Sequence, residues 1–264
     1  MAGIETAALV GSQSRSMVPG IVPGQSHSRR AWSELLASKR PIVITIDGPA
    51  ASGKSSVARE LAQRLGLELL NTGAMYRAAA AVLIQAGLDN RSDPATVVRA
   101  VEAADIHFDF RCKPPMILAY GQPMEDRIED EDVTQLVSPI AGIAQLRAHM
   151  VDRQQHVADT HPRLVSEGRD QGSVVFPQAA VKFFLKASSQ VRALRRATQM
   201  RARGLAPNLE ELQRMIEARD RSDESRLVGP LVCPDDAIVV DTSPMNFEQV
   251  VETLEREVLA RVLV

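Results

Sequence analysis

The sequence predicts an α/β fold in which helices flank a parallel five-stranded sheet that carries a small antiparallel β insert. Short apolar runs alternate with helical stretches long enough for crossover connections. A glycine-rich loop separates the first run from a helix, and one later segment alternates polar and apolar residues strictly. With 264 residues, 45% of them hydrophobic, the chain can bury a core without a metal or disulfide staple.

Residues 1–40 differ in composition from the rest of the chain. They are rich in Ser, Pro and Gly, and Glu5 and Glu34 are their only acidic residues beside several Arg and Lys. This composition is typical of a disordered extension, although an organelle transit peptide has a similar one. We expect a disordered N-terminal extension over 1–40 and folded structure from Pro41.

The predicted core begins with a β-branched strand over 42–46. From Lys54 to Leu65 the apolar positions follow helical spacing. Further apolar runs are predicted to complete a parallel sheet, at 67–70, 164–165, 181–185 and 237–240. The core therefore takes up 41–92 and 138–264.

An insert interrupts this rhythm over about 93–137. Residues 106–110 alternate strictly between apolar and polar side chains, and the turn sequence Lys-Pro-Pro separates them from a second run at 116–120. This pattern predicts an antiparallel hairpin.

Composition and charge exclude several classes of protein. The chain has 31 basic and 33 acidic residues, and this balance argues against a partner such as duplex nucleic acid. Cys112 and Cys233 are far apart, which fits a reducing compartment, and no apolar run approaches the ~20 residues of a membrane helix. We expect a cytoplasmic monomer. His149 and His156 lie seven residues apart, but histidines on a solvated helix are commoner than a metal site.

The segment G-P-A-A-S-G-K-S at 48–55 fits the phosphate-loop pattern and lies between a predicted strand and helix. Its backbone N–H groups and the helix N-terminus suit a polyphosphate. Lys54 is expected to reach the β- and γ-phosphates of ATP, and the Ser55 hydroxyl to bind Mg²⁺. The predicted ATP-binding residues are Gly48, Pro49, Ala50, Ala51, Ser52, Gly53, Lys54, Ser55 and Ser56.

Two arginines follow later strands. Arg77 lies in N-T-G-A-M-Y-R at 71–77, where Thr72 is placed to cap the next helix. Arg169 lies in E-G-R-D at 167–170. Because both segments follow strands, at the sheet edge where α/β folds bind ligands, both arginines are expected in the phosphate-loop cleft.

Arg219, Asp223 and Arg226 have spacings of four and three, so they share one face of a predicted helix. Asp223 can then hold both guanidinium groups in place. The same spacing also makes an ordinary surface salt-bridge ladder, and the spacing alone favours the ladder.

Four segments together resemble the bacterial-type cytidylate kinases among the P-loop nucleoside monophosphate kinases. They are the phosphate loop, N-T-G-A-M-Y-R, E-G-R-D-Q-G-S-V-V-F-P at 167–177 and A-R-D-R-S-D-E-S-R at 218–226. The likeness covers nearly all of 41–264. It implies a P-loop kinase core, a nucleoside-monophosphate-binding insert and a helical lid at about 188–205, a stretch dense in arginine.

The resemblance implies Mg²⁺-dependent transfer of the γ-phosphate of ATP to CMP or dCMP. It also implies that Thr72, Arg77, Arg169, Arg219 and Arg226 surround the acceptor nucleotide together with Asp223. Ser138, Arg147 and Asp170 match the family positions that read the cytosine base. The predicted catalytic residues are Lys54, Arg192 and Arg195.

Some alternatives stay open. Ser138 precedes Pro139, and a serine N-cap followed by proline is typical of a helix start, so from local chemistry Ser138 fits capping as well as it fits contact with the base. Asn71 stands where the family usually has aspartate, and Ser222 where many members have arginine. Rival functions are another small P-loop kinase, acting on UMP, a different nucleotide or a small alcohol, and a nucleotide-binding regulatory module.

Overall fold

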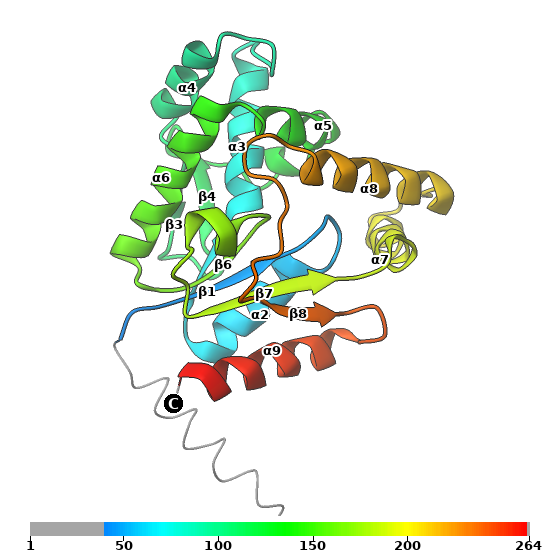
Figure 1. The fold of residues 1–264 in the computed structure, drawn as a ribbon. Helices are drawn as coiled ribbons and strands as arrows, with labels where there is room; N and C mark the ends of the chain where they lie inside the picture. The colour runs from blue at the N-terminus through cyan, green and yellow to red at the C-terminus, as the bar shows by residue number, and fades with distance from the viewer. Residues whose placement is uncertain (1–39, 263–264) are drawn as a thin grey trace, which may run out of the picture.

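The computed structural model describes residues 40–262, and the predicted extension over 1–40 lies almost entirely outside them. The core is a five-stranded parallel sheet that helices cover on both faces (Figure 1). The predicted five-stranded α/β sheet is confirmed. In spatial order its strands are β2 (Glu68–Asn71), β6 (Arg163–Glu167), β1 (Ile42–Asp47), β7 (Val181–Lys186) and β8 (Ile238–Asp241).

Strand β1 occupies the middle of the sheet. Its residue Ile44 pairs with Val165 of β6 on one side and with Val181 of β7 on the other. All pairings are parallel, so the carboxyl ends of the five strands lie at one edge of the sheet. The functional loops leave from this edge.

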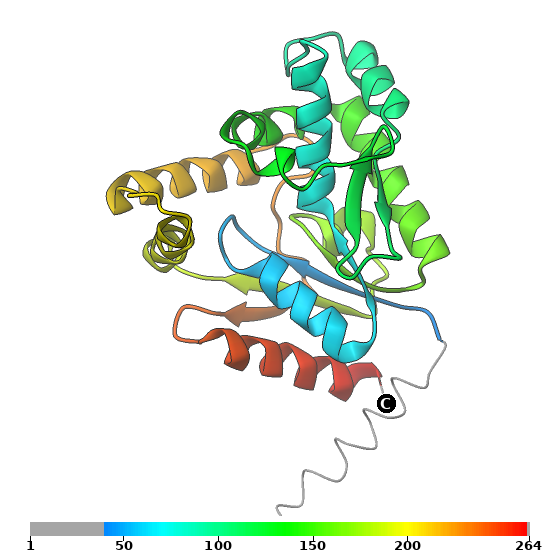
Figure 2. The ribbon, with the colours of Figure 1, turned by 180° about the vertical axis from the view of Figure 1, so that it is seen from behind.

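One face of the sheet packs on α2 and α9 (Figures 1 and 2), and the buried apolar residues of α2 are those that its sequence predicted. The other face carries α3, α6 and the insert. The helices are α2 (Lys54–Leu65), α3 (Thr72–Gln85), α4 (Pro94–Ala103), α5 (Glu131–Ile140), α6 (Ala144–Thr160), α7 (Ser189–Ala202), α8 (Leu209–Glu224) and α9 (Phe247–Val262).

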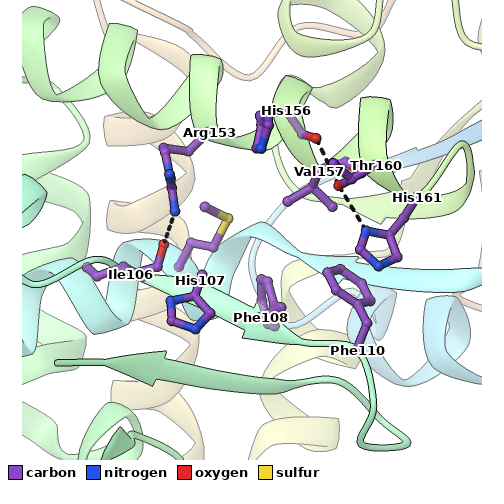
Figure 3. Close-up of a pocket in the computed structure, with 10 residues that line it drawn as sticks. Ile106, His107, Phe108, Phe110, Arg153, His156, Val157, Thr160 and His161 are labelled. Carbon is purple, nitrogen blue, oxygen red and sulfur yellow. Dashed lines mark hydrogen bonds between the residues drawn. The ribbon is translucent and has the colours of Figure 1, made fainter. Parts of the chain in front are cut away.

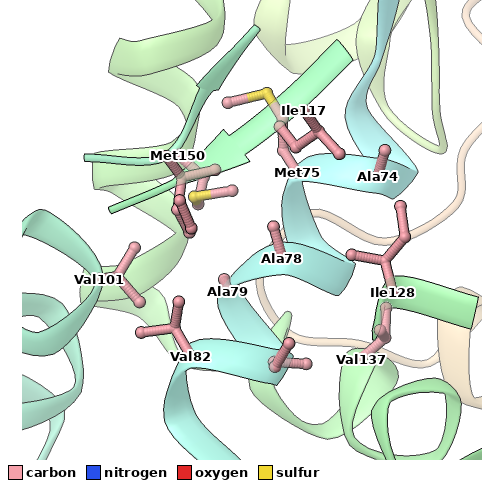
Figure 4. Close-up of a cluster of buried hydrophobic side chains, with 14 of the residues drawn as sticks. Ala74, Met75, Ala78, Ala79, Val82, Val101, Ile117, Ile128, Val137 and Met150 are labelled. Atoms are coloured by element: carbon pink, nitrogen blue, oxygen red, sulfur yellow. The ribbon is translucent and has the colours of Figure 1, made fainter. Parts of the chain in front are cut away.

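Helix α3 is the centre of the second hydrophobic core. Its buried alanines let neighbouring elements approach closely, and Figure 4 shows Ala78 and Ala79 facing side chains such as Val101 and Val137. This packing fixes the direction of α3, whose N-terminus faces the carboxyl edge of the sheet. The residues 71–77 therefore keep one position relative to the phosphate loop.

The predicted antiparallel hairpin is present as β3 (His107–Asp109) and β4 (Met116–Ala119). A third strand, β5 (Gln122–Pro123), was missed because it is only two residues long. The 3₁₀ turn η1 (Arg127–Glu129) then leads into α5. The predicted end of the insert, residue 137, falls within α5, and the division into core and insert stays a prediction.

Helices α7 and α8 form a hairpin beyond the carboxyl ends of β7 and β8 (Figure 1). The Ser188 side chain caps α7, and Asn208 caps α8. Gly204, with φ of 79°, follows the end of α7 in the left-handed conformation that glycine adopts without strain. The predicted lid over 188–205 corresponds to α7. Within residues 40–262, no helix has the length and apolar character that crossing a bilayer requires.

Candidate active site

The phosphate loop follows β1 and opens α2, as the sequence predicts. A Cβ on Gly48 would lie 2.3 Å from the Leu185 carbonyl oxygen, so only glycine fits there. The Lys54 ammonium is buried and donates to the Pro49 carbonyl oxygen at 2.8 Å. Burial, together with the nearby charge of Arg169, lowers the pKa of Lys54 to about 7. An anion in the loop would favour the charged form of this lysine.

Two carboxylates that sequence reasoning missed lie beside the loop. Asp47 ends β1, and its oxygens accept from the backbone N–H groups of Gln171 and Gly172 at 2.8 and 2.7 Å. Burial raises the pKa of Asp47 to about 6. Glu167 ends β6 and accepts from the Ser55 hydroxyl at 2.7 Å. Acidic residues at the ends of predicted strands were the signal that could have found them.

This donor set fits Mg²⁺, which prefers oxygen ligands and usually keeps several waters beside one or two carboxylates. Ser55, Glu167 and Asp47 supply a hydroxyl and two carboxylates at one sheet edge. Within residues 40–262, no three His, Cys, Asp or Glu side chains are grouped so that they could hold a metal by themselves. A metal here would therefore also need oxygens from the substrate.

Asp223 lies at the centre of an arginine cluster, by which we mean Arg77, Arg169, Arg219 and Arg226. Asp223 is 2% exposed and accepts from Arg169 Nε at 3.0 Å and from Arg226. The two spaced partners predicted for Asp223 were Arg219 and Arg226. The ion pair of Asp223 with Arg226 is present, although α8 ends at Glu224 and Arg226 lies beyond it. The second ion pair of Asp223 is with Arg169 and not with Arg219.

Arg219 has a buried Nε without a hydrogen-bond partner in the part of the chain that the structure describes. Burial, followed by repulsion from Arg169, lowers the pKa of Arg219 to about 10. Arg77 donates to the Ile128 carbonyl oxygen at 2.9 Å and to the Thr134 hydroxyl at 2.8 Å. It is also an electrostatic neighbour of Arg169 and Arg219. These residues form a positively charged cluster around Asp223.

Ser138 lies in the last turn of α5, so the alternative that it caps the start of a helix is wrong. The proline after it marks the end of α5 instead. The Ser138 hydroxyl donates to Asp223 at 3.2 Å and lies 3.4 Å from the hydroxyl of Ser222. Ser138 therefore borders the arginine cluster.

Arg147 and Asp170 form a buried ion pair between α6 and the segment after β6. A Cβ on Gly229 would meet the Arg147 guanidinium, so the chain after α8 packs directly on this group. Tyr76, absent from the sequence prediction, is an electrostatic neighbour of Arg147 and Arg226. The predicted base-reading residues thus lie next to the arginine cluster.

Thr72 does not cap α3, contrary to the prediction. Asn71 caps this helix, because its side chain accepts from the Ala74 N–H at 3.0 Å. Thr72 is the first helical residue, and its hydroxyl donates to the Glu167 carbonyl oxygen at 2.8 Å. Asparagine is a better N-cap than threonine, so the cap lies at Asn71, one residue before the predicted position.

The predicted lid arginines contact the phosphate loop. Arg192 is buried and donates to the Ala50 carbonyl oxygen at 3.0 Å and to Asp220 at 2.5 Å. Arg195 donates to the Thr242 carbonyl oxygen at 2.6 Å and to that of Ser52 at 3.4 Å.

The side chain of Arg196, also in α7, is an electrostatic neighbour of Arg77 and has no hydrogen bond or ion pair among residues 40–262. Its guanidinium group therefore has donors that are not already engaged.

A separate pocket of about 190 Å³ lies between the β3–β4 hairpin and α6. Figure 3 shows Arg153 and His156 on its helical side and Phe108 and Phe110 opposite them. Its ten lining residues include none of the predicted site residues. The phosphate loop and the arginine cluster are therefore a different site.

The comparisons with known proteins agree with this geometry. Residues 44–259 match the model of the family described as cytidylate kinase. A cytidylate kinase of Azotobacter vinelandii is 40% identical over 231 residues, which cover 85% of this chain and 98% of that protein. This chain belongs to the cytidylate kinase family.

Other family members give similar values. The cytidylate kinase of Mycobacterium avium is 40% identical over 81% of this chain and 93% of its own length, and that of Bordetella pertussis is 39% identical over 80% and 92%. A shikimate kinase structure from Bacteroides thetaiotaomicron has 12% identity and a TM-score of 0.40 over 83% of this chain and 98% of its own. That similarity is too low to bear on function.

Proposed function

We propose that this protein transfers the γ-phosphate of ATP to CMP or dCMP, giving ADP and CDP or dCDP. The chain belongs to a family of phosphotransferases, and its relatives named cytidylate kinase align over nearly their whole length. The choice of acceptor rests on this match and on the residues next to the arginine cluster. Both nucleotides would bind at the carboxyl edge of the sheet.

The observation that carries the proposal is a surplus of positive charge at the sheet edge. Six cationic side chains interact there, namely Lys54, Arg77, Arg169, Arg196, Arg219 and Arg226. Four carboxylates face them, those of Asp47, Glu129, Glu167 and Asp223. The difference of two positive charges matches one phosphate group, such as that of the acceptor nucleotide. A structural salt-bridge network would balance its charges.

On the donor side, residues 48–56 would hold the phosphates of ATP. The loop N–H groups and the start of α2 bind phosphate oxygens, and Lys54 would reach the β- and γ-phosphates. Ser55 would hold Mg²⁺ directly, with Glu167 and Asp47 behind it. The ion held by these residues would supply positive charge that offsets the negative charge of the phosphates.

On the acceptor side, the arginine cluster would bind the phosphate and sugar of CMP, with Thr72 and Asp223 holding the arginines and the strand end in place. Arg147, Asp170 and Ser138 would read the cytosine base. Its exocyclic amino group is a donor that a carboxylate accepts, whereas uracil offers an acceptor there, so Asp170 favours cytosine.

The chemistry needs no enzyme nucleophile. An oxygen of the CMP phosphate attacks the γ-phosphorus of ATP in line, the bond to the β–γ bridging oxygen breaks, and ADP leaves with that electron pair. Lys54, Arg192 and Arg195 would support the charge on the transferred group. The two arginines already donate to phosphate-loop carbonyl oxygens, so a rotation would bring them to the phosphates. Closure of α7 and α8 would exclude water.

We also infer a monomer that acts in the cytoplasm with ATP and CMP or dCMP as its small-molecule substrates. Cys112 and Cys233 are both free thiols, as in proteins of reducing compartments.

The test is ADP release with Mg-ATP and parallel acceptors: CMP, dCMP, UMP, AMP, GMP and shikimate. We expect turnover with CMP and dCMP well above the others, and its loss in Arg169→Ala. Turnover that is highest with AMP or shikimate would contradict the acceptor assignment. ATP binding without turnover on any acceptor would favour a regulatory module. A second measurement identifies the arginine of α7 that supports transfer. The variants are Arg192→Met, Arg195→Met and Arg196→Met, and we expect the one at that arginine to lower kcat while the KM for CMP stays unchanged.

A further inference from the structure

Residues 170–172 contact both halves of the proposed cleft. Asp170 pairs with Arg147 at the proposed base site. The next two residues, Gln171 and Gly172, donate their backbone N–H groups to the carboxylate of Asp47, directly before the phosphate loop. A single short segment therefore touches the acceptor side at one end and the donor side at the other.

The side chain of Gln171 is itself held in a buried chain of hydrogen bonds. Its Oε1 accepts from the Ser166 hydroxyl of β6 at 2.7 Å, and its Nε2 donates to Gln154 Oε1 of α6 at 3.1 Å. Both glutamines are 1% exposed. Buried amides are costly when unpaired, so these bonds fix the orientation of Gln171.

Helix α6 thus holds the segment at two points. Arg147 and Gln154 are seven residues apart, which places them about two turns apart on one face of the helix. The first point, Arg147 to Asp170, has to rearrange when a base occupies Asp170. The second point, Gln154 to Gln171, involves no group that reads the base.

The segment packs so closely on β1 and β7 that Gly172 leaves no room for a side chain. A Cβ on Gly172 would lie 2.9 Å from Thr45 Oγ1, 3.2 Å from Lys182 Cδ and 3.3 Å from Asp47 Oδ2. Residues 171–175 form a π-helical turn, a rare geometry that is frequent at functional sites. A displacement of this turn would therefore move the hydrogen-bond partners of Asp47.

We propose that Gln171, held by Gln154, couples the acceptor site to the donor site, so that binding of either substrate favours binding of the other. The Gln154–Gln171 hydrogen bond keeps the N–H groups of the turn on Asp47 while Asp170 is engaged by the base. Each substrate favours the position of the turn that the other one requires, so the two binding free energies are coupled. The inference rests on the proposed function, because it takes CMP as the ligand of Asp170. Both glutamines are positioning residues.

The test measures binding and not turnover. The full-length protein is titrated in a calorimeter with CMP, with the Mg²⁺ complex of the non-hydrolysable analogue AMP-PNP, and with each in the presence of the other. The variants are Gln171→Met and Gln154→Leu. The matched control is Gln155→Leu, because Gln155 donates to the Val175 carbonyl oxygen at the far end of the same turn, at 3.0 Å.

We expect wild type and the Gln155→Leu control to bind each ligand at least about fivefold more tightly in the presence of the other, the usual lower range of such coupling. In Gln171→Met and Gln154→Leu the factor should fall below about twofold, while the Kd for CMP alone stays within about threefold of wild type. If Gln171→Met does not fold, Gln154→Leu carries the comparison.

Two results would overturn the inference: no tightening in wild type, or full tightening in a folded glutamine variant. Either one leaves the proposed function intact as long as CMP binds. A wild-type protein that does not bind CMP at all would overturn the proposed function and this inference together.

Discussion

Replacement of Arg219 by methionine should stabilise the free protein and weaken the binding of CMP. The Arg219 guanidinium is largely buried, its Nε has no hydrogen-bond partner within residues 40–262, and Arg169 lies close to it. Its pKa of about 10, against an ordinary 12.5, corresponds to about 3 kcal/mol of unfavourable free energy for the charged group. Residual contact with solvent and the attraction of Asp223 reduce the part that the substitution recovers to about 1–2 kcal/mol.

The assay is urea unfolding followed by circular dichroism, in a buffer without phosphate or sulfate. The free energy of unfolding should rise by about 1–2 kcal/mol in Arg219→Met. The KM for CMP should rise about 30-fold, because a hydrogen bond to a charged phosphate contributes about 2 kcal/mol. Arg221→Met is the matched control, since Arg221 is exposed on the same helix, and it should change neither quantity appreciably.

The reasoning is wrong if Arg219→Met destabilises the free protein by more than about 1 kcal/mol, which is what loss of a satisfied buried ion pair would produce. It is equally wrong if the KM for CMP stays at the wild-type value. Either result would make Arg219 part of the scaffold and remove it from the acceptor site.

Three further outcomes are expected. Gly168→Ala should lower the free energy of unfolding in the urea assay by about 1–3 kcal/mol, because the new Cβ would lie 2.6 Å from Thr72 Oγ1. The control Gly142→Ala should have little effect, because its Cβ would lie 3.4 Å from the nearest atom. Ser222→Arg should lower the KM for CMP about fivefold by adding a donor beside the arginine cluster. Above pH 7 the Kd for Mg²⁺-AMP-PNP should rise about tenfold per pH unit, because neutral Lys54 has to regain a proton on binding. Lys54→Arg should abolish this slope. A wild-type Kd that does not change with pH would contradict the expectation.

Local signals were enough to predict the main elements of the fold. The β-branched run, the glycine loop and the helical spacing after Lys54 each lie within a few residues, so β1, the phosphate loop and α2 could be predicted together. The same holds for the strands that precede Arg77 and Arg169. The error at the start of α3 was also local, because Asn71 and Thr72 both suit a helix cap. The open alternative at Ser138 had a local origin too, because Pro139 is typical of a helix start but lies at the end of α5.

The partners of the site residues could not be predicted, because they depend on strand order. The sheet places β6 beside β1, which brings Glu167 to Ser55 across 112 residues of sequence. In the same way Arg192 meets Ala50 across 142 residues. No pattern within one segment reports such a contact. The composition of the cluster could be predicted from motifs, but not that Arg219 would be left without a hydrogen bond.

The two uncompensated positive charges of the cleft also predict how the fold responds to anions. A phosphate group carries about −1.5 to −2 at pH 7, which matches the surplus. A ligand that binds only the folded state stabilises it by RT ln(1 + [L]/Kd), about 2.7 kcal/mol at one hundred times Kd. Inorganic phosphate should therefore raise the melting temperature of wild type with saturation. The rise should be much smaller in Arg219→Met and unchanged in Arg221→Met. An equal rise in all three proteins would mean that phosphate acts on the general surface and not at the arginine cluster.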